Sequence, residues 1–284
     1  MGFFHLTLPD DIAEGLYELP LLQGGEQAYT VHVVPYTHVS QRVRVTPAVV
    51  RVCVLDVRLE VKRVGYVGSG NDRVGKWLGD IGVDLVDLPA GELSVPRLQE
   101  LGCLVVGIFA FRSRRDLNDM IDDIHAWVKA GGRLITLYHR PWDRWDPEKL
   151  PLGRLEIGSP SLRWRVTDEN AVVRYLNPQH VLLNQPNEIG EGDWGNWHKE
   201  RGLYFAKSWD SAYEPLLEMA DSDEVPHQGI LLAGQFGQGE HIHTALILHH
   251  QMEKLVPGAF RLMANLVSLT GSMEFTPELR LEEG

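Results

Sequence analysis

Hydrophobic residues between 63 and 138 fall into short continuous runs that alternate with a helix-like spacing. Four of the runs predict buried strands, at 64–67, 83–88, 103–109 and 134–138. In the stretch 116–130, apolar residues recur every three or four positions, which predicts a helix that ends at Gly131. Strands that alternate with helices in this way predict a parallel sheet with right-handed crossovers and helices on both faces.

The flanking segments have different patterns. Residues 28–62 are rich in valine that alternates with polar residues, which predicts a small β-segment, while residues 1–27 are expected to form an arm or loop. A long irregular insertion at 171–210 follows the parallel strands. Two further strands and a final helix are predicted at 230–233, 241–248 and 256–269. The chain should therefore divide into an N-terminal arm and β-segment (1–62) and an α/β domain (63–284).

Composition and charge limit the classes of partner. The chain has 284 residues, of which 44% are hydrophobic and 23% are charged, as is typical of globular proteins. The formal net charge of −12 repels phosphate backbones and anionic lipids, so neither nucleic acid nor a membrane is expected as a partner. The first residues lack the basic region of a signal peptide. Cys53 and Cys103 lie in apolar runs, which favours buried thiols over a disulfide and predicts a cytoplasmic protein.

Glycine and histidine patterns raise the question of a cofactor or metal site. Gly68 and Gly70 follow the first predicted strand, but Arg73 stands where a dinucleotide-binding GxGxxG motif needs its third glycine. A structural turn is therefore favoured, although amides at this helix start could bind a small anion. His241 and His243 share one face of a predicted strand, but a histidine eight residues beyond His241 would lie about 26 Å away in an extended strand. We expect no metal and no cofactor.

Several phrases of the sequence resemble the C-terminal, glutamine-amidotransferase-like domain that is attached to some PIG-L (LmbE-type) N-acetylglucosaminyl deacetylases. The phrases are VGYVGSGND (64–72), LVVGIFAF (104–111), AGGRLITLYHR (130–140), RVTDENA (165–171), NPQHVLLNQPNEI (177–189), DWGNWHKERGLYF (193–205) and GAFRLMANLVS (258–268). The resemblance covers about residues 40–270. It implies an α/β, class I glutamine-amidotransferase-like (flavodoxin-like) fold with a mostly parallel sheet, preceded by a small N-terminal β-segment.

The sequence departs from the family pattern in two places. The AHPDDE-like motif that supplies zinc ligands to the deacetylase is absent, because the nearest string, Leu8-Pro9-Asp10-Asp11-Ile12, has no preceding histidine. The turn after the fourth predicted strand has Tyr138 and His139 where an amidotransferase needs a nucleophilic cysteine, and no glutamate stands two residues after His249. We therefore expect the accessory domain alone, without thiolate chemistry; whether it is an enzyme stays open.

The segment 193–201 has the densest mixture of aromatic and charged residues. Its tryptophans could stack on a sugar ring while carboxylates bind the hydroxyl groups. The favoured alternative is structural: an ion pair between Glu200 and Arg201, with tryptophans that anchor the loop. Because open α/β sheets bind ligands at the carboxyl ends of their strands, a pocket would join this segment to residues expected there. The candidate pocket residues are Asp72, His139, Asp168, Glu169, Asp193, Trp194, Trp197, Glu200 and Arg201.

Two functional hypotheses follow from the resemblance and from the candidate pocket. The first is a non-catalytic or carbohydrate-binding domain, which takes a glycan or another small molecule and partners a separately encoded deacetylase. The alternative is a hydrolase that acts on a glycan or an amide through His139 and nearby carboxylates. The sequence leaves the ligand, the partner and the oligomeric state open.

We predict that no activity of this protein depends on a thiol. Both cysteines lie in apolar runs, where the reactive thiolate form is disfavoured. In the native protein, a maleimide reagent should label Cys53 and Cys103 slowly, and much faster after denaturation. Rapid native labelling that abolishes a hydrolytic activity would contradict this prediction.

Overall fold

The computed structural model describes residues 7, 9, 11–36, 38 and 40–268. The first six residues, part of the segment on which the signal-peptide argument rests, and Leu269, the predicted end of the final helix, lie outside the described residues. The chain forms two compact units, residues 1–56 and residues 57–284.

The first unit consists of antiparallel ribbons. Strand β1 (Gly15–Pro20) pairs with β6 (Val49–Val54), and β4 (Tyr29–Val34) pairs with β5 (Arg42–Pro47). A short hairpin of β2 (Leu22–Gln23) and β3 (Glu26–Gln27) lies between them in the sequence. The strands β1 to β3 fall inside the stretch 1–27, for which the sequence predicts an arm or loop. The pattern of residues 1–27 is short and interrupted by glycines, so it does not predict a strand. Strand β1 forms there because it pairs with β6, later in the chain.

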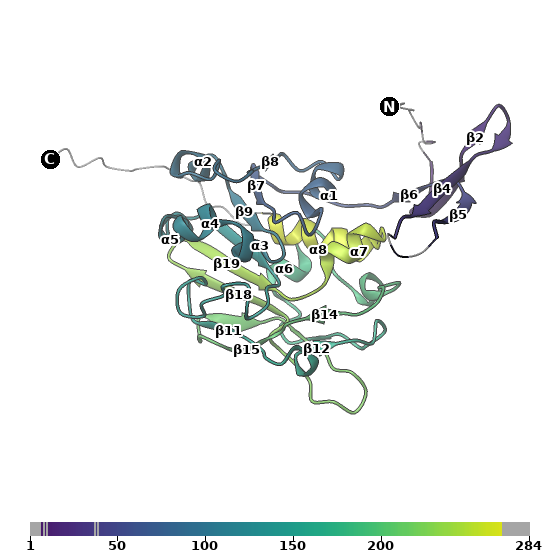
Figure 1. The fold of residues 1–284 in the computed structure, drawn as a ribbon. Coiled ribbons are helices and arrows are strands. Elements are labelled where there is room, and N and C mark those ends of the chain that lie inside the picture. The colour runs from purple at the N-terminus through teal and green to yellow at the C-terminus, as the bar shows by residue number, and fades with distance from the viewer. Residues whose placement is uncertain (1–6, 8, 10, 37, 39, 269–284) are drawn as a thin grey trace. The chain divides into compact units, whose positions relative to one another are not determined.

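A seven-stranded sheet forms the centre of the second unit (Figure 1). Its strand order is β16-β18-β19-β10-β9-β7-β8. The strands are β7 (Val64–Val67), β8 (Leu85–Asp87), β9 (Cys103–Val106), β10 (Arg133–Leu137), β16 (Tyr213–Pro215), β18 (Leu231–Phe236) and β19 (Gly239–Thr244). The first four strands of the domain pair in parallel, as the sequence predicts, and β19 joins them in parallel with β10. When the five parallel strands are numbered in sequence order, their spatial order across the sheet is 2-1-3-4-5. This is the flavodoxin-like order of a doubly wound sheet.

Two antiparallel strands extend the parallel part. Strand β18 pairs with β19 through a tight hairpin, and β16 pairs with the outer edge of β18. The strands predicted at 230–233 and 241–248 form this hairpin with shifted bounds: β18 continues to Phe236, while β19 begins at Gly239 and ends at Thr244, before the predicted end at Leu248, where α7 begins.

Helices cover both faces of the sheet. On one face, α2 (Val95–Gln99), α4 (Arg115–Asp119) and α5 (Ile121–Lys129) share a buried core with alternate strand residues such as Leu104, Val106 and Leu134. On the other, α8 (Pro257–Val267) packs against β10 and contacts α1 (Val74–Asp80), α6 (Val181–Asn184) and α7 (Leu248–Glu253). The predicted helix 116–130 is divided between α4 and α5, which meet at Met120.

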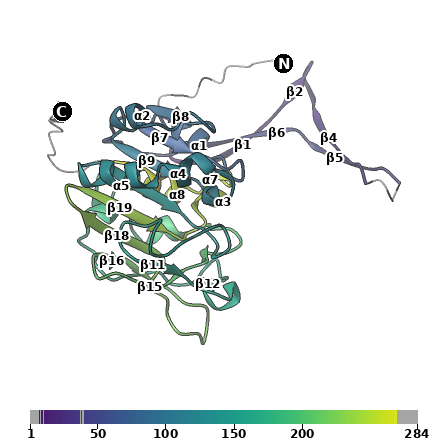
Figure 2. The same cartoon turned by 60° about the vertical axis from the view of Figure 1, so that its left-hand side comes forward.

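The segment between β10 and β18 builds a small irregular region from short antiparallel pairs (Figure 2). These pairs are β11 (Leu155–Ile157) with β15 (Ala206–Trp209), β12 (Arg165–Val166) with β14 (Gly202–Leu203), and β13 (Arg174–Tyr175) with β17 (Leu217–Glu218). Two 3-10 turns, η1 (Ser161–Arg163) and η2 (Glu191–Trp194), complete the region. Within the described residues, no helix is long and apolar enough to cross a bilayer.

We predict that Gly258→Ala destabilises the domain by about 1–3 kcal/mol, because the added methyl group would overpack the contact between α8 and η2. A Cβ at Gly258 would lie 2.0 Å from the backbone oxygen of Asp193. The control is Gly79→Ala in α1, where a Cβ meets nothing within 4 Å; it should keep or raise stability, by up to about 1 kcal/mol. Urea unfolding of both variants measures the difference, and equal stabilities would contradict the prediction.

Candidate functional site

Between β7 and β9 lies the topological switch point of the sheet, where the chain connections turn toward opposite edges. From β7 the chain crosses to β8 on one side, and from β9 it crosses to β10 on the other. In doubly wound sheets, the crevice at such a switch point, outside the carboxyl ends of the strands, is the usual place for a ligand. The two loops that border it are 68–73, after β7, and 107–109, after β9.

Asp72 joins these two loops. Its carboxylate accepts hydrogen bonds from the Val74 N–H at 2.9 Å, from the Ile108 N–H at 3.0 Å and from the Tyr66 hydroxyl. Gly107 makes room for it, since a Cβ there would lie 2.8 Å from Asp72 Oδ2. Burial raises the pKa of Asp72, although the three hydrogen bonds oppose the shift. The Val74 amide at the start of α1, considered above as a site for a small anion, is therefore already bound by the Asp72 carboxylate.

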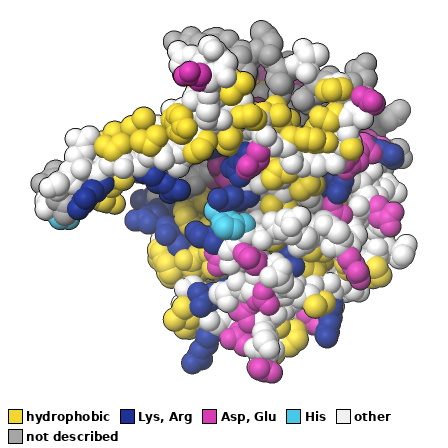
Figure 3. Space-filling model, turned by 90° about the vertical axis from the view of Figure 1, so that its right-hand side faces the viewer, with side chains coloured by type: hydrophobic (Ala, Val, Ile, Leu, Met, Phe, Trp, Pro, Cys, Tyr) yellow, Lys and Arg dark blue, Asp and Glu magenta, His cyan; other side chains and the backbone are white. Residues whose placement is uncertain are grey.

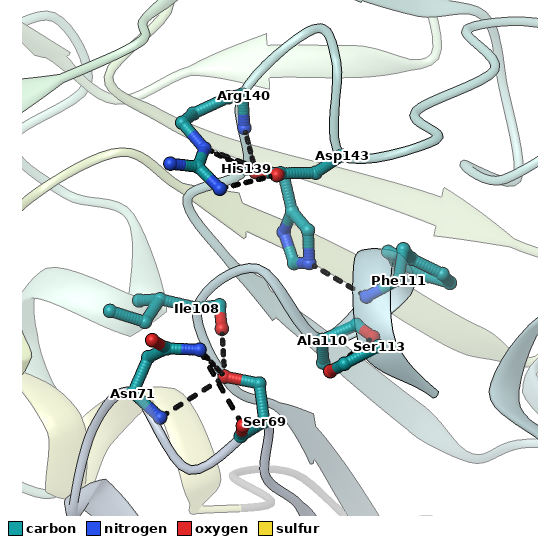
Figure 4. A network of polar contacts seen from close by, with 9 residues as sticks. All are labelled: Ser69, Asn71, Ile108, Ala110, Phe111, Ser113, His139, Arg140 and Asp143. Atoms are coloured by element: carbon teal, nitrogen blue, oxygen red, sulfur yellow. Dashed lines mark hydrogen bonds and ion pairs between the residues drawn. The ribbon is translucent and has the colours of Figure 1, made fainter. Parts of the chain in front are cut away.

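Ser69 adds a second connection between the loops (Figure 4). Its hydroxyl donates to the Ile108 carbonyl at 2.6 Å and accepts from the Asn71 side-chain amide at 2.8 Å. The glycine-containing turn predicted at 68–70 is thus a structural turn, held by its own polar side chains.

Phe109 occupies the turn from β9 into α3 (Ala110–Ser113) with a left-handed backbone, φ 59°. From the sequence, the turn in which an amidotransferase carries its nucleophile is expected one strand later, at Tyr138 and His139. The sharp strand-to-helix turn of this domain lies after β9 instead, and β10 leads into a loop. A residue in such a turn presents its side chain at the sheet edge, where hydrolases carry their nucleophile. Phenylalanine has no nucleophilic atom, so this turn cannot supply one.

His139 follows β10 and is completely buried, with 0% exposure. Its Nδ1 donates to the Leu137 carbonyl at 2.7 Å, and its Nε2 accepts the Phe111 N–H at 3.4 Å (Figure 4). Burial lowers the pKa of His139 to about 4. Both ring nitrogens are engaged within the protein and neither meets solvent, which is the arrangement of a structural histidine.

Next to it, the partly exposed Arg140 and the buried Asp143 form an ion pair that was not predicted from the sequence. Arg140 donates through its backbone N–H at 2.8 Å and through its guanidinium at 2.7 Å to the Asp143 carboxylate. The hydrogen bonds to Asp143 raise the pKa of Arg140. The pair closes a tight turn after β10, and the only sequence signal for it was the spacing of three between opposite charges.

Four aromatic rings gather where this turn meets the switch point: Phe109, Tyr138, Trp142 and Tyr204. Tyr138 stacks on Tyr204 with centroids 5.8 Å apart and meets Phe109 edge-on at 5.3 Å, while Trp142 meets Tyr204 edge-on at 5.8 Å. The Arg140 guanidinium lies 3.9 Å from the centre of the Phe109 ring. We call these four rings the aromatic cluster. Trp142 is 56% exposed, so the cluster offers a ring face to solvent.

Carboxylates lie close to the aromatic cluster. Burial raises the pKa of Tyr138, and the charges of Glu200 and Asp72 raise it further. The pKa of Glu200 is itself raised by partial burial. The structure thus brings three predicted site residues, Asp72, His139 and Glu200, to the carboxyl ends of the parallel strands.

The side chains of Asp193, Trp194 and Trp197 in the segment 193–201 form hydrogen bonds within the protein. Asp193 accepts a hydrogen bond from Arg261 of α8 at 2.7 Å and another from the Gly190 N–H at 2.9 Å. The Trp194 indole donates to the Tyr175 hydroxyl at 2.6 Å, and the Trp197 indole donates to the Asp193 carbonyl at 3.1 Å. The tryptophans are buried anchors, as the favoured alternative expected.

The expected partner of Glu200 is engaged elsewhere. Arg201 donates to the carbonyls of Ala171, at 2.9 Å, and Trp194, at 2.7 Å. Burial lowers the pKa of Arg201 to about 10. The predicted ion pair between Glu200 and Arg201 is therefore not formed. Instead, Asp193 pairs with Arg261, which joins the segment to α8.

Asp168 and Glu169 take separate places. Glu169 accepts the Lys199 N–H at 2.6 Å and so helps to fold the 193–201 segment. Asp168 is exposed and lines a cavity of about 360 Å³ in the irregular region. That cavity is lined by Asp168, Asn170, Ala171, Val172, Arg174, Glu218, Met219, Ala220, Ser222, Glu224 and Pro226.

The strand histidines form a buried polar chain. Thr136 Oγ1 lies 3.0 Å from His241 Nε2 and 2.9 Å from His243 Nδ1, and the Tyr213 hydroxyl lies 2.6 Å from His241 Nδ1. Both histidines are completely buried. Across the described part of the chain, no three histidine, cysteine or carboxylate side chains are grouped so that they could hold a metal ion.

We predict that His139 makes the protein less stable as the pH falls. Its pKa of about 4 in the folded state lies below the usual 6.5, so the unfolded chain binds the extra proton. The free energy of unfolding should therefore fall by about 2 kcal/mol from this group between pH 6.5 and pH 5. Urea unfolding of His139→Gln should show a correspondingly shallower loss. Equal slopes for wild type and His139→Gln would contradict the assignment.

Comparisons with known proteins give neither a family nor a function. No family model and no curated protein matches the chain. Cytoplasmic protein STM3548 from Salmonella typhimurium is 12% identical, with a TM-score of 0.48 over 89% of this chain and 94% of that one. Cytoplasmic protein STM1381 from Salmonella typhimurium LT2 is 11% identical, with a TM-score of 0.45 over 85% and 95%. The exo-β-1,4-mannosidase Op5Man5 from Opitutaceae bacterium strain TAV5 is 13% identical, with a TM-score of 0.41 over 74% and 36%.

Proposed function

We propose that this protein is a non-catalytic, glutamine-amidotransferase-like domain that binds a carbohydrate on the aromatic cluster. The proposal rests chiefly on the place of that cluster, at the switch point of a doubly wound sheet, with Trp142 open to solvent. Aromatic faces stack on the apolar faces of sugar rings, and this surface joins such a face to polar groups.

The polar groups nearby suit a neutral, hydroxyl-rich ligand. Glu200 is half-buried beside Tyr138 and Tyr204 and can accept hydrogen bonds from hydroxyl groups. Asp72 is occupied by two amides and a phenol, so it positions the loops instead of meeting the ligand. A phosphorylated ligand is disfavoured, because the amides that would bind it are already satisfied by Asp72.

The strand-to-helix turn after β9 offers no nucleophile, which supports a binding role. The turn that would carry one has Phe109, and Cys103 lies inside β9 with its pKa raised by burial to about 12. In the family that the sequence resembles, such a domain accompanies a deacetylase, and a separately encoded enzyme of that class is the partner we propose. Cys103 is buried as predicted and fits a reducing cytoplasm, whereas Cys53 is only partly buried, contrary to the prediction, because β6 belongs to a two-stranded ribbon.

Hydrolysis through His139 is the weaker alternative. A general base has to reach the proton that it removes, and both nitrogens of His139 are engaged with the backbone in the interior. Its low pKa also reflects burial rather than a partner carboxylate, since burial is the largest cause.

Binding of N-acetylglucosamine oligomers, measured by calorimetry, tests the proposal. We expect Trp142→Ala to weaken binding at least about tenfold, because one stacking face contributes about 1.4 kcal/mol or more. The melting temperature should change little, since the side chain is largely exposed.

Trp197→Ala is the matched control. This side chain is buried and braces η2, so its loss should lower the free energy of unfolding by about 3–5 kcal/mol. In conditions where the variant stays folded, its affinity for the ligand should be unchanged. Binding that survives Trp142→Ala, or no binding of any glycan across a broad array, would refute the proposed function.

A further inference from the structure

The aromatic cluster continues beyond Tyr138 into three histidine rings. Tyr138 contacts His249 of α7 with ring centroids 5.5 Å apart, and His249 contacts the neighbouring His250 at 6.3 Å. His250 in turn stacks on His198 at 5.4 Å, with an angle of 21° between the ring planes. We call this continuous succession of rings the ring series; in order, its members are Trp142, Tyr204, Tyr138, His249, His250 and His198.

The two ends of the ring series are open to solvent. Trp142 at one end and His198 at the other are exposed, whereas the rings between them are half-buried or buried. Helix α7 lies on the side of the second unit that Figure 3 shows, and on that side histidine reaches the surface next to basic side chains. The ring series therefore ends in two stacking surfaces, of which the aromatic cluster provides only one.

A single loop connects the two stacking surfaces and carries a hydrogen-bonding group between them. Residues 198–204 supply His198 at one end, Tyr204 at the other, and the half-buried Glu200 in between. Six residues span at most about 22 Å when fully extended, which limits the separation of the two surfaces. Because several rings separate Trp142 from His198, one sugar, which is about as large as one of these rings, cannot cover both. A ligand that contacts both surfaces is therefore a short chain of sugars.

The connecting loop is held in place by α7. The buried Gln251 accepts a hydrogen bond from the His198 N–H at 2.9 Å and donates one to the His198 carbonyl at 2.9 Å. Lys199 and Tyr204 have left-handed backbones, with φ of 79° and 58°. Strained conformations of this kind persist only where the surrounding structure holds them, and they cluster at ligand sites. Because the loop is already ordered, less conformational entropy is lost when a ligand binds to it.

We propose that the glycan site extends from Trp142 to His198 and takes a linear oligosaccharide rather than a single sugar. One sugar unit stacks on Trp142, a later unit stacks on His198, and hydroxyl groups between them donate hydrogen bonds to Glu200. This inference rests on the proposed function, because it adds a second stacking surface to the site at Trp142. It assigns to His198 the selection of ligand length.

Calorimetry with N-acetylglucosamine oligomers of increasing length, from the monosaccharide upward, tests the extended site. The affinity of the wild type should rise about tenfold at the length that first reaches His198, because a second stacking face then contributes. Oligomers longer than this should bind with little further gain.

Variants at His198 show whether its ring causes the rise. His198→Ala should weaken the binding of long oligomers about tenfold and should bind short ones as the wild type does. His198→Tyr keeps an aromatic face and should retain the rise, whereas His198→Gln keeps only a polar group and should lose it. His32→Ala is the matched control, since it removes another exposed histidine, in the first unit, and should change no affinity. Circular dichroism and thermal unfolding confirm that each variant keeps its fold.

The outcomes separate this inference from the proposed function. Wild-type binding that does not depend on oligomer length overturns the extended site, and so does a His198→Ala variant that keeps the rise. If His198→Ala weakens short and long oligomers equally, His198 acts through the shape of the aromatic cluster, and the second stacking surface is overturned. These three results leave the site at Trp142 standing, whereas a failure of every glycan to bind refutes the proposed function and the extension together.

Discussion

The carboxylate of Asp72 is the interaction on which the functional end of the molecule depends. It holds the first residue of α1 and the loop after β9 in a fixed relation, at the point where the parallel strands diverge. That relation sets Phe109, and through Phe109 it sets Tyr138 and the stacked Tyr204. Removal of this carboxylate would leave two buried amides unpaired, at a cost of about 1–3 kcal/mol each.

Buried polar groups define the interior of the sheet as firmly as its valines and leucines do. His139, His241 and His243 are neutral and enclosed, and Thr136 links two of them. His241 is hydrogen-bonded at both ring nitrogens, whereas His243 is bonded through Nδ1 and its Nε2 is buried without a partner, which is costly in a low dielectric. The histidines therefore specify the register of β10 against β19, where Thr136 pairs with His243.

The sequence predicted what depends on local pattern and missed what depends on distant partners. The four parallel strands were predictable, because each is a continuous apolar run that helices cover on both faces. Helix α7 was missed, since its six residues include two adjacent histidines and a glutamine and show no helical periodicity. The role of Arg201 was misjudged, because nothing in the sequence shows that backbone carbonyls would hold its charge. Trp142 and Asp143 were overlooked for a similar reason. Trp142 contacts Tyr204, and Asp143 holds the Arg140 side chain that lies over Phe109, and the sequence shows neither contact.

The left-handed turn at Phe109 has a consequence for the history of such a scaffold. A side chain in that conformation is strained, by about 1–3 kcal/mol, and here no reactive atom justifies the strain. The left-handed conformation of Phe109 is therefore imposed by the short connection from β9 into α3. Phenylalanine and cysteine codons differ by a single base. A single-base change could therefore place a thiol in this turn without any rearrangement of the backbone, but His139, whose two ring nitrogens are already engaged, could not activate it.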